Sequence, residues 1–522
     1  MAKGIGTKRV SLHNKYVSVS LYRKNERKRK GAYGHVLKYT GVFGGVQGLN
    51  VLVSLVRNKF VALLLGPSGM GLVSLFNTTV TFVSQATHFG ISMSAVRHLS
   101  DYPDDDSHPQ ITHFVKVVRA WSLLTALLGM LVCIAIGPFL SNTTFAWGDH
   151  SLHFILLSPA VGMLAVTGGE TAILKARRRL MSLAMVQVGS VFAALFMSVP
   201  VYYFFGEAGI VPVIVMMAFV TMVLTLRESY RLYPLQLRGA KGILGEGMEM
   251  VRLGVAFTLA GIIGSGAEML IRSWLNVTGD LDVLGLYNAG YMITVTYAGM
   301  VFSAMETDYF PRLSAVSSDV AATNETVNKQ MEVSILIVSP MLVGLIIFLP
   351  VMIPLLFSSK FLPVVAMTQM AAVAMFFKAI TLPSAYITLA RGYSLMFLFL
   401  ESAYYVVFIL LIILGYQHLG LLGTGIAITL ANIFDYVMIN AVARWRYGYK
   451  MSPAVMKYSV IHILIGLLAY FTTVTVSGYA YWVFGIGLTL VSMLFSLMVL
   501  HQKTHLWERL KQKYFSFLNK RT

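Results

Sequence analysis

Two cations stand close together near the end of the first apolar stretch of this 522-residue chain. Arg57 and Lys59 are followed directly by the apolar segment Phe60–Leu65. A charge at such a depth in a membrane is costly, and it usually faces protein or a watery cavity. Guanidinium and ammonium groups both bind phosphate oxygens, the former in a planar bidentate way. We therefore interpret these two residues as candidate anion-binding side chains, with anchoring to outer lipid phosphates as the alternative.

Later apolar stretches contain further charges. Arg272 lies in the seventh stretch, and Glu268 precedes it by four residues, which places both on one helix face. Arg272 is a further candidate for anion binding. Glu268 is a candidate for binding a coupling proton or sodium ion, and an internal salt bridge with Arg272 is the alternative. Lys378, in the middle of the tenth stretch, is another candidate cavity cation. Asp435 and Glu401 are candidate proton-relay groups. Asp435 is also, after Glu268, the second candidate for binding a coupling ion.

A polar stripe precedes Arg57 on the same predicted helix. Gln47, Asn50 and Ser54 recur about one helical turn apart, on the face that also carries Arg57. Such a stripe can line a cavity, so Gln47 and Asn50 are candidate substrate-binding residues. Because several glycines lie nearby, a close helix-packing seam is the alternative interpretation.

Motifs of catalysis and metal binding are missing from the sequence. It has no Gly-rich phosphate loop ending in Gly-Lys-Ser/Thr, no Gly-x-Ser-x-Gly, no His-Glu-x-x-His and no metal-spaced histidine cluster. The single cysteine, Cys133, excludes a disulfide framework and a cysteine metal site. We therefore expect neither an enzyme nor a bound metal or cofactor.

The composition is that of a membrane protein. Hydrophobic residues make up 57% of the chain and charged residues only 12%, against about 25% in a typical soluble domain. Repeated apolar stretches of 18 or more residues indicate membrane helices. We predict an all-α polytopic protein of about fourteen helices, at roughly 38–62, 70–92, 115–140, 152–174, 181–205, 208–226, 253–275, 286–306, 333–356, 363–389, 393–415, 420–440, 457–477 and 480–500.

Lysine and arginine alternate in number between the loops on the two sides of the membrane. If the N-terminal tail is cytoplasmic, all but five of the 41 basic residues fall in cytoplasmic segments. The exceptions are Arg57, Lys59, Arg272, Lys360 and Lys378. The positive-inside rule then places both termini in the cytoplasm. The net charge of +19 lies against an anionic leaflet, so membrane lipids are expected partners and nucleic acid is not.

An internal repeat divides the chain, because three motifs recur at one constant offset. Gly71-Leu72 recurs as Gly285-Leu286, Gly206-x-x-Gly209 as Gly420-x-x-Gly423, and Ala176-Arg177 as Ala390-Arg391. Six helices per copy make the two lobes parallel, related by an axis along the membrane normal. The predicted regions are a basic tail (1–37), an N-lobe (38–240), a C-lobe (241–445), a terminal helix pair (446–500) and a basic amphipathic tail (501–522).

Two segments resemble a known family of exporters. The sequence LGPSGMGL that begins at Leu65, and the segment Ile271–Leu313 with GLYNAGY and DYFPRL, are similar to bacterial polysaccharide flippases. The chain resembles the O-antigen translocase (Wzx-type) branch of the multidrug/oligosaccharidyl-lipid/polysaccharide exporter superfamily over about residues 36–500. The long basic N-terminal tail departs from the family pattern.

The resemblance implies two six-helix bundles, alternating access and a cationic cavity. It implies export of undecaprenyl-diphosphate-linked oligosaccharide units across a bacterial inner membrane. We expect a monomer that works with polysaccharide-assembly proteins. The alternatives are an ion-coupled multidrug or cation antiporter of the same fold and a peptidoglycan lipid-precursor flippase. A membrane-embedded glycosyltransferase or polymerase is a further alternative, but it would usually need larger outer loops for catalysis than the short ones predicted here.

Overall fold

The computed structural model consists of helices, without any strand in the part of the chain that it describes. The described residues are 6–100, 109–144, 150–177, 179–235, 243–297 and 312–504, together with 299, 302, 309 and 310. Residues 505–522, which form most of the predicted amphipathic tail (501–522), lie outside them.

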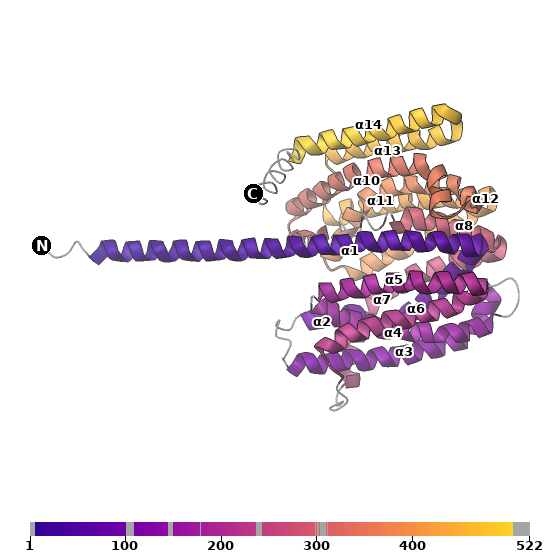
Figure 1. Cartoon of the computed structure of the whole chain (residues 1–522). Coiled ribbons are helices and arrows are strands. Elements are labelled where there is room, and N and C mark those ends of the chain that lie inside the picture. Colours follow the sequence, from indigo (N-terminus) through magenta and orange to yellow (C-terminus); the bar gives the residue numbers. More distant parts are fainter. Residues whose placement is uncertain are drawn as a thin grey trace, which may run out of the picture.

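The N-terminal half of the structure contains long helices that run side by side (Figure 1). Its elements are α1 (Gly6–Thr87), α2 (Ile91–Ser100), α3 (Pro109–Thr144), α4 (Ser151–Ala176), α5 (Leu180–Phe205), the short η1 (Gly206–Gly209) and α6 (Ile210–Leu232). Helix α1 begins at Gly6, so the predicted tail 1–37 contributes the first part of this helix.

The C-terminal half also consists mainly of long helices. Its elements are α7 (Ile243–Thr278), α8 (Leu281–Tyr291), η2 (Met292–Tyr297), α10 (Val320–Leu356), η3 (Ser359–Val364), α11 (Val365–Ala390), α12 (Ser394–Tyr447), α13 (Pro453–Thr475) and α14 (Gly478–Thr504). The segment η2 is a π-helix, a rare form that often occurs at functional sites.

The helices agree with a multi-pass membrane protein. Nine stretches of the described chain are long and apolar enough to cross a membrane. Large apolar side chains also cover the outer surface, including Phe204 and Leu395, which are 75% and 80% exposed. A soluble monomer rarely exposes apolar side chains in such number. We conclude that the bundle lies in a bilayer.

Three of these stretches reverse direction at a glycine. Gly66 within α1, Gly206 after α5 and Gly420 within α12 all have positive φ angles. Gly206 (φ 56°, ψ −133°) and Gly420 (φ 56°, ψ −140°) have nearly the same backbone conformation, which residues other than glycine rarely adopt. Since Gly420 is the equivalent of Gly206 in the second copy, the predicted repeat extends to the backbone angles.

Helix ends repeat in the same way. The N–H of Arg177 donates to the carbonyl oxygens of Ile173 and Lys175. The N–H of Arg391 donates to those of Ile387 and Leu389, which are the equivalent residues of the second copy. The predicted repeat is therefore confirmed at two pairs of corresponding helix ends.

The two copies meet at a pair of equivalent glycines. A Cβ atom on Gly71 of α1 would overlap the carbonyl oxygen of Leu281, and one on Gly285 of α8 would overlap that of Pro67. Pro67 and Leu281 are themselves equivalent in the repeat. Gly71 thus contacts Leu281 in the same way as its equivalent, Gly285, contacts Pro67, the equivalent of Leu281. Such a reciprocal contact occurs at a twofold axis. The pseudo-twofold axis of the repeat therefore passes between α1 and α8.

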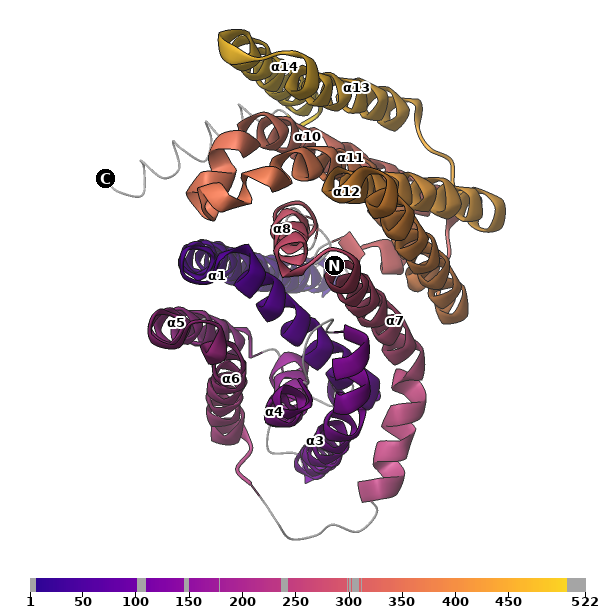
Figure 2. The same cartoon turned by 90° about the vertical axis from the view of Figure 1, so that its right-hand side faces the viewer.

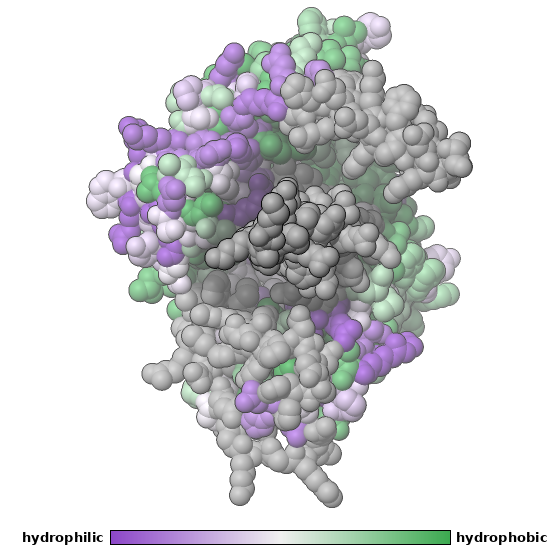
Figure 3. Space-filling view, turned by 90° about the vertical axis from the view of Figure 1, so that its left-hand side faces the viewer, coloured by the Kyte–Doolittle hydropathy of each residue, from purple (hydrophilic) through white to green (hydrophobic). Residues whose placement is uncertain are grey.

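Two lobes flank this axis (Figure 2). Helices α3 to α6 lie on one side, α10 to α12 on the other, and α1, α7 and α8 lie between them. The terminal pair α13 and α14 packs outside the second lobe, on α10. We call the end of the bundle where α1 enters and α14 ends the terminal end. Hydrophilic side chains gather on parts of its rim, with hydrophobic ones on the flank behind (Figure 3).

Candidate functional site

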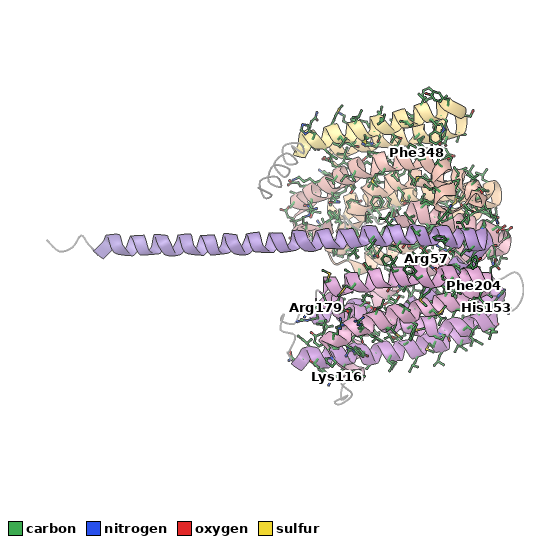
Figure 4. All side chains as sticks on the ribbon, in the orientation of Figure 1. Arg57, Lys116, His153, Arg179, Phe204 and Phe348 are labelled. Carbon is green, nitrogen blue, oxygen red and sulfur yellow. The ribbon has the colours of Figure 1, made fainter. Side chains whose placement is uncertain are left out.

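A cavity of about 310 Å³ lies between the lobes, beside the pseudo-twofold axis. Arg57 on α1 and Arg272 on α7 both line it, and the rest of its wall includes Ser74, Asn77, Asn288 and Tyr291. Figure 4 shows Arg57 in the middle of the bundle, between the two lobes. The structure thus brings together two of the sequence-predicted cations, one from each copy of the repeat.

Arg272 is held firmly in the wall of this cavity. Its Nη1 atom lies 3.0 Å from Glu268 Oε2, one turn earlier on α7, and its Nε donates to Ser74 Oγ at 3.0 Å. Ser74 in turn donates to Asn288 Oδ1 at 2.7 Å, and these two residues are equivalent in the repeat. The guanidinium also lies 5.3 Å from the centre of the Tyr291 ring. Arg272 therefore joins α7, α1 and α8 at the axis.

Glu268 has partners for both carboxylate oxygens. Oε2 pairs with Arg272, and Oε1 accepts a hydrogen bond of 3.1 Å from the Tyr291 hydroxyl. The salt bridge that the sequence offered as an alternative is therefore present. The side chain is still 35% exposed, so an ion can reach it.

Arg57 has no carboxylate among its described partners. Its Nε donates to Ser198 Oγ on α5 at 3.3 Å, and its Nη2 lies 3.6 Å from Met217 Sδ on α6. Neither partner neutralises the guanidinium. Glu268 balances the charge of Arg272, whereas no described carboxylate pairs with Arg57, so among the described residues the cavity carries one uncompensated positive charge at membrane depth.

Lys59 points elsewhere. Its ammonium donates at 2.7 Å to the carbonyl oxygen of Pro354, in the last turn of α10. Carbonyl groups in the last turn of a helix lack intrahelical partners and attract cations. Lys59 therefore joins α1 of the first lobe to α10 of the second, and it is not among the residues that line the arginine cavity.

The polar stripe of the first helix lies toward α5. Asn50 Nδ2 is 3.5 Å from Gln187 Oε1, at the limit of a hydrogen bond, and Asn50 Oδ1 has no described partner. The side chain of Gln47 lies outside the part of the chain that is described. Asn50 is not among the described residues that line the arginine cavity.

Lys378 forms a second charged group inside the C-lobe. It lies on α11, and its charge acts on both Glu401 and Asp435 of α12. Tyr405 of α12 lies near these two carboxyl groups and near Glu268. Within the described residues, no group of three His, Cys, Asp or Glu side chains is arranged to hold a metal ion.

A buried ion pair in the N-lobe was not predicted from the sequence. Arg119 on α3 donates twice to Glu170 on α4, at 2.8 Å from Nε and 3.3 Å from Nη2. Ser229 on α6 donates to the same carboxylate at 2.5 Å, and Arg119 stacks 4.1 Å from the centre of the Tyr230 ring. Glu170 lies inside an apolar stretch, which is the signal that could have singled it out.

A polar stripe on the second half of α1 was also not predicted. Ser74, Asn77 and Thr78 line the arginine cavity, and Thr81, Ser84, Gln85 and His88 line a second cavity nearer the terminal end. The spacing of three and four residues places all seven on one helix face. This periodicity is visible in the sequence from Ser74 to His88.

Comparison with known proteins gives the chain a family. The sequence profile of a family described as polysaccharide biosynthesis protein matches residues 60–366, more than half of the chain. The chain belongs to this family. No curated protein matches the sequence.

Solved structures of transporters share its fold. A multidrug resistance MATE family transporter of the MOP superfamily, in an inward-facing conformation, is similar with a TM-score of 0.65 and 16% identity; 80% of this chain and 99% of that chain are covered. The lipid II flippase MurJ in an inward closed conformation has a TM-score of 0.61 and 14% identity over 88% of this chain and 99% of that one. A MOP superfamily transporter from Pyrococcus furiosus, described as having a binding pocket of reverse polarity, has a TM-score of 0.52 and 14% identity, with 78% and 94% covered.

These similarities confirm the predicted fold class. The chain is an all-helical membrane protein of the polysaccharide biosynthesis family with the MATE- and MurJ-like fold of the MOP superfamily. The count of fourteen helices stays a prediction, because α7 and the segment after η2 include residues whose side chains or backbone are not described.

Proposed function

We propose that this protein flips an undecaprenyl-diphosphate-linked oligosaccharide from the cytoplasmic to the periplasmic leaflet of a bacterial inner membrane. The terminal end of the bundle would then face the cytoplasm. The observation that carries the proposal is the uncompensated guanidinium of Arg57, which shares a cavity with Arg272 between the lobes. A partly buried cation at membrane depth without a counter-ion is costly, and an anionic ligand reduces that cost.

A diphosphate suits this cavity better than an organic cation does. Arginine binds phosphate oxygens through a planar set of donors, and two such groups converge here. Ser74 and Asn77 add uncharged hydrogen-bonding groups to the same wall. A cavity for cationic drugs needs carboxylates and aromatic rings, and among the described lining residues only Tyr291 is of these kinds. The antiporter is therefore the second candidate.

Transport would follow from movement of the lobes about the axis. The Gly71–Gly285 contact and the Lys59–Pro354 hydrogen bond hold the lobes together away from the terminal end. Rocking about this region would expose the cavity alternately to the two sides of the membrane. Of the two ion-coupling candidates, Asp435 is favoured, because both oxygens of Glu268 already have partners.

Arg57→Ala is expected to lower the rate of lipid transfer by about tenfold or more, since a charge-assisted hydrogen bond contributes about 1.5–3 kcal/mol. The measurement is transbilayer transfer of an undecaprenyl-diphosphate oligosaccharide by the purified chain in liposomes. Arg57→Lys keeps the charge without the planar donors and should retain an intermediate rate.

Arg231→Ala is the matched control, since it removes an exposed cation whose one ion pair among the described residues is with Glu228, one turn away. It should transfer lipid at the wild-type rate. Unchanged transfer by Arg57→Ala would keep the flippase and remove this site. Wild-type protein that transfers no lipid but moves organic cations would favour the antiporter.

A further inference from the structure

A second, larger cavity lies in the N-lobe, nearer the terminal end. Its volume is about 620 Å³, within the range of about 300–1,000 Å³ typical of ligand sites. The walls come from the end of α1, from α2 and from α4, with one residue of α7. It is twice as large as the arginine cavity, although no predicted site residue lines it.

Hydroxyl, amide and imidazole side chains make up more than half of its described lining residues, although most of the wall surface is apolar. Thr81 and Thr167 each donate their hydroxyl proton to the carbonyl four residues earlier, at 2.8 and 2.7 Å. Their oxygen atoms keep free lone pairs that can accept hydrogen bonds from a ligand. Gln85 is exposed and has no hydrogen-bond partner among the described residues, so its amide can both donate and accept.

His88 is fixed in this wall by the residues around it. A hydrogen bond joins it to the backbone of Ala165, and its Nε2 lies 3.1 Å from Ser92 Oγ. Gly168 on α4 leaves room for the ring, because a Cβ there would lie 2.9 Å from His88 Nε2. No carboxylate lines the cavity among the described residues, and its one charged lining residue is the exposed Lys175. The wall is therefore close to neutral, with uncharged polar side chains set in an apolar surface.

The two cavities are adjacent along one helix. Thr78 lines the arginine cavity and Thr81 lines the second, and three residues of an α-helix rise about 4.5 Å. A ligand whose diphosphate contacts Arg57 and Arg272 therefore places the group attached to that diphosphate at the entrance of the second cavity.

Two polar positions of this wall are apolar in the second copy of the repeat. The residues equivalent to Thr81 and His88 in the second copy of the repeat are Val295 and Phe302, and both pack in the hydrophobic core. At these two positions the second copy therefore carries apolar side chains where the first carries polar ones. This difference between the copies is what a ligand site present only in the first lobe would require.

We propose that the second cavity binds the sugar units of the lipid-linked substrate while the arginine cavity binds its diphosphate. This inference rests on the proposed function and adds a carbohydrate subsite lined by Thr81, Gln85, His88, Thr167 and Thr171. A polyol donates and accepts many hydrogen bonds, which matches free hydroxyl lone pairs and an unpaired amide. A lipid tail would leave these groups without partners.

The test compares two probes on the full-length protein in lipid nanodiscs. One is undecaprenyl diphosphate, and the other is undecaprenyl diphosphate that carries a linear trihexose. Native mass spectrometry measures the dissociation constant of each. The double variant Thr81→Val with Gln85→Leu should bind the trihexose lipid about tenfold more weakly, since it loses two hydrogen-bonding groups. Its affinity for the sugar-free lipid should not change.

Two further variants separate the possible failures. Thr472→Val removes a hydroxyl with the same backbone hydrogen bond on α13, away from both cavities, and should leave both constants unchanged. Arg57→Ala should weaken both probes. Equal weakening of both probes by the double variant, or no weakening of either, would overturn the subsite and leave the flippase. Wild-type protein that binds neither probe would overturn the proposed function and the subsite with it.

Discussion

Glu170→Gln is expected to lower the free energy of unfolding by about 3–5 kcal/mol, the range for removing one partner of a buried ion pair. The side chains of Arg119 and Glu170 are 11% and 3% exposed. Glutamine has nearly the shape of glutamate, so the change removes charge and leaves packing in place. The guanidinium of Arg119 then stays in the protein interior without a counter-charge, which is the source of the loss.

The Glu170 carboxylate connects three helices of the N-lobe. It accepts hydrogen bonds from Arg119 on α3 and from Ser229 on α6, while it lies on α4 itself. The second lobe has Ser384 and Val333 at the positions equivalent to Glu170 and Arg119, so the pair belongs to the first lobe alone. Its loss should therefore weaken the N-lobe.

Denaturation of the purified protein in mixed detergent micelles measures the effect. Glu325→Gln is the matched control, because Glu325 pairs with Lys329 where both side chains are more than half exposed, and such pairs contribute about 0–1 kcal/mol. The double variant Arg119→Met with Glu170→Met should recover most of the stability, since a buried pair replaced by apolar side chains is often neutral. A single variant as stable as the control would contradict the assignment of a buried pair.

The sequence predicted the membrane fold well because the bilayer imposes a simple rule on each helix. A span must be long and apolar, and this can be judged from a single segment. The predicted stretches 152–174 and 181–205 correspond to α4 (Ser151–Ala176) and α5 (Leu180–Phe205). The internal repeat could also be predicted, because a tight reversal of the chain requires glycine, and glycine therefore recurs at equivalent positions of the two copies.

The candidate site could be predicted only in part. Arg57 and Arg272 share a cavity, as their charge at membrane depth suggested. Lys59, two residues from Arg57, instead contacts a helix end of the other lobe, because residues two apart on a helix point to different sides. The repeat makes Arg272 equivalent to Asn58, so the two arginines converge from positions that do not correspond exactly.

Uncharged polar residues that line a cavity are harder to predict from the sequence than charged ones. Serine and threonine occur often in membrane helices, where they bond to their own backbone. A stripe such as Ser74 to His88 therefore differs from ordinary packing only by its periodicity. That this stripe faces open space depends on α2 and α4, which the order of residues along α1 does not reveal.

Gly285→Ala is expected to separate the two lobes at their axis and to cost more than the roughly 1–3 kcal/mol typical of overpacking. A Cβ at this position would overlap the carbonyl oxygen of Pro67 and lie 2.6 Å from its carbonyl carbon. Both obstacles are backbone atoms, which cannot rotate away as a side chain can. The helices α1 and α8 must then move apart, and the hydrogen bond between Ser74 and Asn288 one turn further on would lengthen.

The equivalent glycine provides a graded comparison. In Gly71→Ala the new Cβ overlaps the carbonyl oxygen of Leu281 less closely, so the loss of stability should be smaller. Gly487→Ala on α14 meets no atom within 4 Å and should be neutral or stabilising by up to about 1 kcal/mol, since alanine favours helix. Denaturation in detergent gives the order, and lipid transfer in liposomes should fall in the same order. A Gly285→Ala protein as stable as Gly487→Ala would show that α1 and α8 do not meet at these glycines, and the twofold axis would have to lie elsewhere.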